Sequence, residues 1–374
     1  MLELISETNY RETMENTVEP KLASIREELS LPLEDGGALH AELYEQPTAT
    51  RAVVVLHGYT ESGEKFREMT WYFLQSGFNV YAIDHRGHGR SARAVDETWL
   101  THVDHFSDYV RDLEAFMDRV VLPRAKNLPL CLYAHSMGGA VGSMMLQRHP
   151  KMFARAVLTA PMIAPSSAPF PSWAGAAIAK FMCAIGKTRE MAFIGKPFDP
   201  QSETFEASFG TGRARFDYYE RKRLENRHLQ NCAPTYGWVR EAIGVTKVLL
   251  NRELDRQIET PLLLCQAARD TVVRLPEQNE FVSLLPHAQL RAFDAKHEIY
   301  MSDDTVMREY VPAVIGFLRG GRRPPRLACM LGRTSAFSFL IALIFLIPPA
   351  YRPQRGGEYP DTSAPTQSGD NPYA

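Results

Sequence analysis

Hydrophobic and polar positions follow two alternating patterns along this chain. Short continuous apolar runs, which are typical of strands buried on both faces of a sheet, are separated by segments whose apolar residues recur at helical spacing. This alternation predicts a mostly parallel central sheet flanked by helices on both faces. The predicted strands span residues 38–44, 51–56, 78–83, 130–135, 155–160, 260–266 and 288–293, and the predicted helices span 66–75, 105–121, 276–285 and 303–318.

One long segment, residues 161–259, interrupts the alternation and shows no evident strand. We therefore predict an α/β core formed by residues 25–160 and 260–320, with residues 161–259 as an inserted helical cap. Within the cap, helical or apolar stretches are expected near residues 173–185, 216–228 and 236–250.

Residues 1–30 are expected to form a charged, partly helical lead-in without the pattern of a secretion signal. Strand 38–44 is expected at the edge of the sheet.

Composition narrows the class of protein further. With 374 residues and 45% hydrophobic content, the chain can form a sizeable core with a large insertion. A formal net charge of −2 gives no electrostatic reason to expect nucleic acid as a partner. The five cysteines form no C-x-x-C pair, which indicates reduced thiols and a cytoplasmic location.

The C-terminal region, residues 321–374, differs in composition from the rest. A basic run at 319–326 precedes an almost wholly apolar segment at 336–347, and residues 352–374 are expected to be disordered. The apolar segment is shorter than the roughly 18 residues that a membrane span needs. Three interpretations stay open. The segment is a marginal anchor that holds the body on the cytoplasmic face of a membrane, a tail packed against the body, or a tail that is incidental to function.

The stretch Leu130-Cys-Leu-Tyr-Ala-His-Ser-Met-Gly-Gly-Ala140 carries the main chemical signal. A short apolar run ends in a serine flanked by small residues, and a helix is predicted to follow. This is the strand–turn–helix context of a G-x-S-x-G nucleophile elbow, with Ala134 in place of the first glycine. Ser136 is therefore the candidate nucleophile, against the alternative of a serine that caps a helix.

A serine hydroxyl needs a base and a third group that orients the base. Asp270 and His297 each follow a predicted strand, at the edge of the sheet where ligands bind in open parallel sheets. The chain order Ser136, Asp270, His297 is the one that nucleophile-elbow hydrolases use. Two rivals exist: Asp294 is too near His297 in the chain for an easy opposed geometry, and His287 precedes its strand and so faces the wrong end.

Charge that develops on a substrate carbonyl oxygen needs two backbone N–H donors. Met137, the residue after the nucleophile, is expected to provide one, because the helix begins there. The Tyr59 amide, in the turn after strand 51–56, is expected to provide the other, with His57-Gly58 shaping that turn.

Other residue groups allow two interpretations each. His85, His88, His102 and His105 have spacings in which a metal site is imaginable, but no carboxylate or cysteine pattern completes one, so no metal is expected. The charges at 213–227 are expected to be the solvated face of a cap helix, with phosphate head groups as the alternative partner. The segment at 173–185, with Phe181 and Met182, is either an apolar wall for an acyl chain or cap core.

Together these motifs resemble the α/β-hydrolase fold, and more narrowly the branch of monoglyceride lipases, bacterial lysophospholipases and serine aminopeptidase-like hydrolases. The resemblance covers roughly residues 25–320 and implies Ser136, Asp270 and His297 as a catalytic triad and cofactor-free ester hydrolysis. A serine ester hydrolase acting on a lysophospholipid or monoacylglycerol is expected, with an aminopeptidase, thioesterase, acyltransferase or non-catalytic scaffold as alternatives. The motifs that carry the resemblance are His57-Gly58, Asp84-x-Arg86-Gly87-His88-Gly89-x-Ser91, His135-Ser136-Met137-Gly138-Gly139, Asp270, His297-Glu298 and the cap stretch Ala233-Pro-Thr-Tyr-Gly-Trp-Val-Arg-Glu-Ala242.

Overall fold

An eight-stranded sheet forms the centre of the protein in the computed structural model, which describes residues 2–166 and 171–320. The strand order is β1-β2-β4-β3-β6-β7-β9-β10; β1 and β2 run antiparallel to their neighbours, and the remaining pairs are parallel. The strands are β1 (Arg26–Pro32), β2 (Ala38–Tyr44), β3 (Arg51–Leu56), β4 (Phe78–Ile83), β6 (Leu130–His135), β7 (Arg155–Thr159), β9 (Leu262–Ala267) and β10 (Ala288–Phe293).

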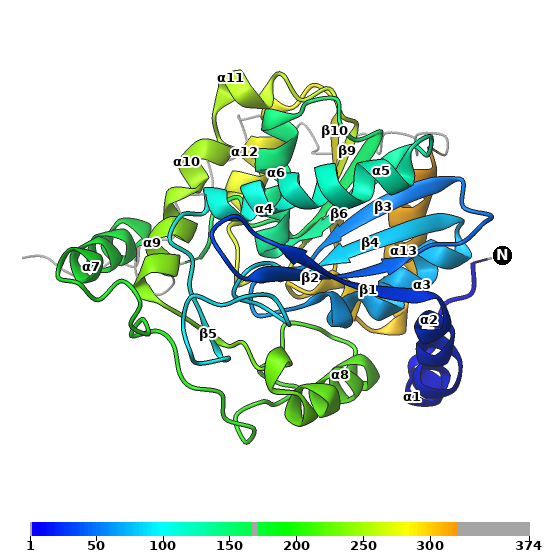
Figure 1. The fold of residues 1–374 in the computed structure, drawn as a ribbon, viewed down its shortest axis with the longest axis horizontal. Helices are drawn as coiled ribbons and strands as arrows, with labels where there is room; N and C mark the ends of the chain where they lie inside the picture. Colours follow the sequence, from blue (N-terminus) through cyan, green and yellow to red (C-terminus); the bar gives the residue numbers. More distant parts are fainter. Residues whose placement is uncertain (1, 167–170, 321–374) are drawn as a thin grey trace, which may run out of the picture. The chain divides into compact units, whose positions relative to one another are not determined.

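The continuous apolar runs follow from burial of both faces of the sheet. In β3, Val54 and Leu56 enter one hydrophobic cluster, whereas Val53 and Val55 enter the other. Helices α4 (Ser107–Phe116), α6 (Ser136–Arg148) and α12 (Leu275–Leu284) contribute to the first cluster, and α3 (Arg67–Gln75) and α13 (Asp304–Arg319) to the second (Figure 1). This is the predicted mostly parallel sheet flanked by helices.

Two sequence-based expectations about the sheet are wrong. Strand β2 is not the edge strand, because β1 pairs along its whole length and forms the edge. Strand β1 lies within the region taken as a charged lead-in, and five of its seven side chains are partly or fully exposed polar groups or proline. An edge strand with polar exposed positions carries no continuous apolar run, so the pattern did not reveal it.

The segment between β7 and β9 contains several helices separated by irregular stretches, and the assignment of residues 161–259 as a helical cap stays a prediction. The described residues of this segment include a short strand, β8 (Ala233–Pro234), which pairs with β5 (Leu100–Thr101). A strand of two residues is too short to be predicted from a sequence pattern. Helices α7, α9 and α10 gather at one end of the sheet, at the left of Figure 1. The insertion's helices are α7 (Ser172–Ala184), α8 (Arg213–Glu225), η5 (Arg227–Leu229), α9 (Tyr236–Gly244), α10 (Thr246–Leu249) and α11 (Arg252–Asp255).

Helix α7 presents large apolar side chains to the surface. Trp173 is 74% exposed and Phe181 is 63% exposed, whereas Ala179 is buried. The interpretation of this segment as ordinary cap core therefore fails for its two largest side chains.

The N-terminal helices pack against the body of the protein. Tyr10, Met14, Val18 and Leu22 bury their side chains in the second cluster. These helices are η1 (Glu7–Asn9), α1 (Tyr10–Thr13), η2 (Met14–Val18) and α2 (Glu19–Ile25), and the remaining short helices are η3 (Gly63–Phe66), η4 (Met117–Val121), α5 (Leu122–Ala125) and η6 (Ile299–Met301).

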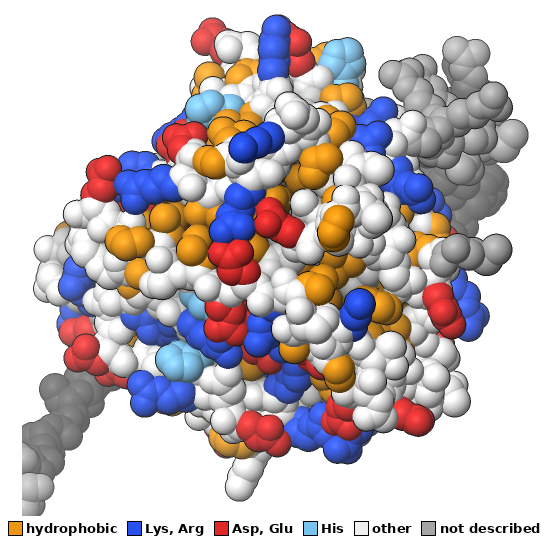
Figure 2. All heavy atoms as spheres, turned by 45° about the vertical axis from the view of Figure 1, so that its right-hand side comes forward, with side chains coloured by type: hydrophobic (Ala, Val, Ile, Leu, Met, Phe, Trp, Pro, Cys, Tyr) orange, Lys and Arg blue, Asp and Glu red, His pale blue; other side chains and the backbone are white. Residues whose placement is uncertain are grey.

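The expectation that the charges of α8 form a solvated face is wrong for Arg215. Its side chain is fully buried; it donates to Glu68 at 2.9 Å and to the Ser302 carbonyl at 3.1 Å. Neighbouring cations on this helix are also paired, Arg223 with Glu203 and Lys222 with Glu64. Because these cations are already paired with carboxylates, the geometry does not support the alternative that they bind phosphate head groups. Acidic and basic side chains are intermingled on the face shown in Figure 2.

The C-terminal predictions fall outside the described residues. This applies to the apolar segment at 336–347, to the expected disorder of 352–374 and so to any membrane anchor there. Within residues 2–166 and 171–320, no helix combines the length and apolar character that crossing a membrane requires. The boundary between core and cap likewise stays a prediction.

Asp84 joins three segments, and its removal tests how the core is held. Its buried carboxylate accepts hydrogen bonds from Gly63 N (2.7 Å), Arg90 N (3.0 Å) and His40 Nδ1 (3.1 Å). Burial alone would raise the pKa of Asp84, but the His40 hydrogen bond, nearby histidine charge and the backbone donors together lower it. We expect Asp84→Asn to lose about 2–3 kcal/mol of unfolding free energy at pH 7, because an amide nitrogen cannot accept from an N–H.

A lowered pKa means that the stabilisation is present above the unfolded carboxyl pKa of about 4 and is lost as pH falls towards the folded pKa. The difference between wild type and Asp84→Asn should therefore shrink from pH 7 to pH 3, as measured by urea unfolding. An equal difference at both pH values would contradict this account of Asp84.

Candidate active site

Ser136 lies at a sharp turn between β6 and α6. Its backbone φ is +50°, in the left-handed region that side chains rarely adopt, so the turn stores strain as a nucleophile elbow does. Close packing explains the glycine that follows. A Cβ on Gly138 would lie 2.5 Å from the carbonyl oxygen of His57 and 2.6 Å from that of Leu56.

Ala134, which stands where the elbow pattern has glycine, is fully buried and faces Gly142 in helix α6. A Cβ added at Gly142 would lie 3.4 Å from the Ala134 Cβ, an ordinary van der Waals distance, and 3.0 Å from Leu132 Cδ2, which is tight. The departure from the motif is compatible with the turn.

The structure brings Ser136, His297 and Asp270 together. His297 Nε2 lies 2.8 Å from Ser136 Oγ, and His297 Nδ1 lies 2.7 Å from Asp270 Oδ2. The three residues follow β6, β10 and β9, whose carboxyl ends meet at one edge because β6, β7, β9 and β10 are parallel. Ser136 and His297 are each 5% exposed, so their hydrogen bond is shielded from bulk water.

Hydrogen bonds around Asp270 fix the protonation of the imidazole. Asp270 Oδ1 accepts from the backbone N–H groups of Val272 (2.8 Å) and Val273 (3.0 Å). Burial would raise the pKa of Asp270, but the His297 hydrogen bond and charge and these two donors lower it overall. The ionised carboxylate therefore receives the Nδ1 proton, which leaves Nε2 free to accept the Ser136 proton.

The two rival residues lie elsewhere. The Asp294 side chain is 85% exposed and pairs with Arg269 at 2.8 Å. His287 is exposed and precedes β10, so it lies at the opposite end of the strands from His297.

The turn after β3 packs directly against the serine. A Cβ on Gly58 would lie 3.0 Å from the Ser136 Cβ, so only glycine fits there. His57 Nδ1 donates to the Gly58 carbonyl oxygen at 2.7 Å, and His57 Nε2 accepts from His85 N at 2.9 Å. The Tyr59 N–H belongs to the same trans peptide as that carbonyl, so His57 also fixes the direction of this N–H. The Met137 N–H belongs to the first turn of α6, where donors have no partner within the helix.

Of the clustered histidines, His85, His88 and His102 are buried and His105 is exposed. His85 and His88 are buried beside the His57 ring, with centroids 4.7 Å and 5.3 Å away. His102 bonds Thr235 Oγ1 at 2.8 Å. In the described residues, a group close enough to share a cation is Glu28, His40 and Glu42, but Arg67 already pairs with Glu42 at 3.0 Å.

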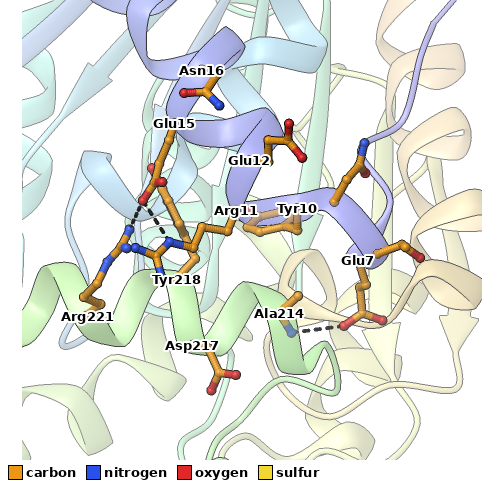
Figure 3. Close-up of a pocket in the computed structure, with 12 residues that line it drawn as sticks. Glu7, Tyr10, Arg11, Glu12, Glu15, Asn16, Ala214, Asp217, Tyr218 and Arg221 are labelled. Carbon is orange, nitrogen blue, oxygen red and sulfur yellow. Dashed lines mark hydrogen bonds and ion pairs between the residues drawn. The ribbon is translucent and has the colours of Figure 1, made fainter.

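A separate cavity of about 620 Å³ lies between the N-terminal helices and α8 (Figure 3). Among the residues that line it, Glu15 pairs with both Arg11 and Arg221, and Glu7 accepts a hydrogen bond from the Ala214 N–H at 3.2 Å. Neither Ser136 nor His297 lines it. We interpret it as part of the contact between the N-terminal segment and α8.

Sequence reasoning missed a buried group beside the serine. Glu61 accepts hydrogen bonds from both Lys65 and Tyr300, and Lys65 also pairs with Glu298. In the sequence, only the position of Glu298 next to His297 pointed to this group, because Glu61 and Lys65 are far from Glu298 and Tyr300 in the chain.

The fold and this arrangement of serine, histidine and carboxylate define an α/β-hydrolase. The family described as "Serine aminopeptidase, S33" matches residues 47–304, and the chain belongs to that family. Its resemblance to lysophospholipases and monoglyceride lipases is confirmed: lysophospholipase L2 of Escherichia coli (strain K12) is 33% identical over 288 residues, which cover 73% of this chain and 82% of that protein. The monoacylglycerol lipase of Mycolicibacterium smegmatis is 31% identical over 143 residues, covering 38% of this chain and 49% of that protein.

Solved structures agree on the fold. A soluble variant of monoglyceride lipase from Saccharomyces cerevisiae, in complex with a substrate analogue, aligns with a TM-score of 0.65 at 15% identity, covering 79% of this chain and 95% of that one. The expected enzyme class is confirmed by these relatives: the protein is a serine ester hydrolase.

Proposed function

We propose that this enzyme removes one acyl chain from a lysophospholipid or a monoacylglycerol through an acyl-enzyme on Ser136. The observation that carries the proposal is the chain of hydrogen bonds from Ser136 Oγ through His297 to Asp270, with distances of 2.8 Å and 2.7 Å. Such a chain is what a serine needs to become a nucleophile at neutral pH.

In the first half-reaction, Ser136 Oγ attacks the ester carbonyl carbon while His297 Nε2 takes the hydroxyl proton. The oxygen of the tetrahedral intermediate accepts hydrogen bonds from the N–H groups of Tyr59 and Met137. His297 then donates its proton to the departing glycerol oxygen. In the second half-reaction, water attacks the acyl carbon while His297 Nε2 takes a proton from the water. His297 then returns this proton to Ser136 Oγ as the bond between the acyl carbon and Oγ breaks and the fatty acid leaves. Asp270 stabilises the imidazolium throughout.

The lipid substrate is supported by relatives named lysophospholipase and monoacylglycerol lipase. An acyl chain also needs apolar surface, because burying each CH₂ is worth about 0.8 kcal/mol. The exposed apolar side chains of α7, Trp173 and Phe181, offer such surface, and we assign the acyl chain to this helix. This acyl-wall role was one of the two interpretations of segment 173–185.

A substrate panel tests the proposed substrate class. Lysophosphatidylcholine, a monoacylglycerol, an acyl-CoA and proline-p-nitroanilide would be compared by kcat/KM, with reactions lacking protein as the blank. We expect fatty acid release from the first or second substrate to be fastest. Preferred cleavage of the anilide would contradict the proposal and favour an aminopeptidase, as the family description allows. Preferred cleavage of the acyl-CoA would identify a thioesterase.

A further inference from the structure

A buried row of charges connects the turn that carries the Tyr59 N–H with the loop that carries His297. It consists of Glu61 in the turn after β3, Lys65 in η3, and Glu298, the residue after His297. Lys65 Nζ lies 3.2 Å from Glu61 Oε1 and 2.5 Å from Glu298 Oε1. The three side chains are 2%, 9% and 13% exposed, in the order Glu61, Lys65, Glu298. We call this group the Lys65 brace.

At one end, the brace holds the turn that carries the Tyr59 N–H. Glu61 Oε2 accepts the Gly58 N–H at 2.6 Å, so the peptide directly before the Gly58–Tyr59 peptide is fixed by a carboxylate. Glu61 Oε1 accepts the Tyr300 hydroxyl at 2.5 Å. Tyr300 in turn stacks on Phe66, with ring centroids 4.4 Å apart.

At the other end, the brace holds the loop that carries the imidazole. The side chain of Glu298 is bound by Lys65, and its backbone N–H donates to the carbonyl oxygen of Phe209 in the insertion at 2.9 Å. The residue directly before it is His297. Any shift of this loop would therefore change the distance from His297 Nε2 to Ser136 Oγ.

Lys65 is charged in this setting. Burial would lower the pKa of its ammonium group, but the carboxylates of Glu298 and Glu61 raise it above its usual value. The ring of Tyr219, in α8, lies 5.1 Å from Nζ. Burying such charges is costly, and an apolar replacement of a whole buried ion network is often neutral or stabilising. Stability alone is thus a poor reason to retain this network.

We propose that Lys65 is a positioning residue, which sets the N–H donors of the Gly58–Tyr59 turn and the imidazole of His297 at a fixed mutual geometry. The inference rests on the proposed function. Lys65 itself touches no reacting atom, because it acts through Glu61 on the turn and through Glu298 on the His297 loop. Because effects of this kind alter the transition-state geometry and leave substrate contacts in place, they lower kcat more than they change KM.

The test compares Lys65→Met with Arg67→Met. Arg67 lies two residues away, is 8% exposed and is also ion-paired with buried carboxylates, including Glu42 at 3.0 Å, so it is matched in burial and charge. Active sites are counted by fluorophosphonate labelling, and kcat is expressed per labelled site. We expect Lys65→Met to lower kcat by about tenfold or more with KM within about twofold, and Arg67→Met to leave kcat per site unchanged.

A double-mutant cycle separates positioning from a general loss of folding. Glu298→Gln keeps the shape of the side chain and all of Lys65, so it also reports on the brace if Lys65→Met does not fold. If the two residues act as a unit, the double variant should lose no more kcat than the worse single variant. Wild-type kcat per labelled site in both single variants, or an equal loss in Arg67→Met, would overturn the inference. Absence of labelling and of ester hydrolysis in the wild type would instead overturn the proposed function.

Discussion

Replacing Asp270 with asparagine is expected to lower kcat by about 10,000-fold while the protein stays folded. The physical reason lies in the two backbone donors on Asp270. The N–H groups of Val272 and Val273 hold Oδ1, so the asparagine oxygen will take that position and its NH₂ group will face His297. An NH₂ donor forces Nδ1 to act as acceptor, which moves the imidazole proton to Nε2. Nε2 then cannot accept the proton of Ser136.

The control for this prediction is Asp294→Asn. Asp294 is the nearby carboxylate that sequence alone could not exclude, and it is exposed and paired with Arg269. Steady-state hydrolysis of a soluble ester, with circular dichroism to verify folding, measures both variants. We expect wild-type kcat for Asp294→Asn. A large loss in that variant, with activity kept in Asp270→Asn, would mean that the wrong carboxylate has been assigned.

The second large effect is expected from removing the Tyr59 N–H. Tyr59→Pro deletes this donor, and loss of one such donor typically lowers kcat by about 100- to 1,000-fold. Proline also removes the aromatic ring, which packs on Trp238 with centroids 4.1 Å apart. Tyr59→Ala therefore serves as the matched control, because it removes the ring and keeps the N–H.

Labelling of Ser136 and thermal unfolding would be measured alongside kcat. We expect Tyr59→Ala to retain most of the activity and Tyr59→Pro to lose it, with similar melting temperatures. Equal kcat in the alanine and proline variants would show that the donor is a different group.

The sequence was informative where one local rule decides the outcome. Ser136, Asp270 and His297 each follow a predicted strand, and parallel strands bring their carboxyl ends to one edge, so their meeting could be predicted without any contact information. Strand β10 was predicted at its observed bounds, Ala288–Phe293, although Gln289 and Arg291 interrupt its apolar residues.

Features that depend on tertiary partners could not be predicted. In sequence, Arg215 resembles the other arginines of a charged helix. Its burial is compensated by groups that are distant in the chain, Glu68 in α3 and the Ser302 carbonyl oxygen. Lys65 and Glu298 form a hydrogen bond although they are 233 positions apart in the chain.

The proposed function requires a covalent acyl intermediate at Ser136. The direct measurement mixes the enzyme with a monoacylglycerol or lysophospholipid that it hydrolyses, quenches the reaction with acid within one turnover and maps the adduct by peptide mass spectrometry. We predict one acyl group on the peptide that contains Ser136, and neither adduct nor turnover in Ser136→Ala. Hydrolysis by Ser136→Ala at the wild-type rate, with no acyl group on the wild-type peptide, would contradict it.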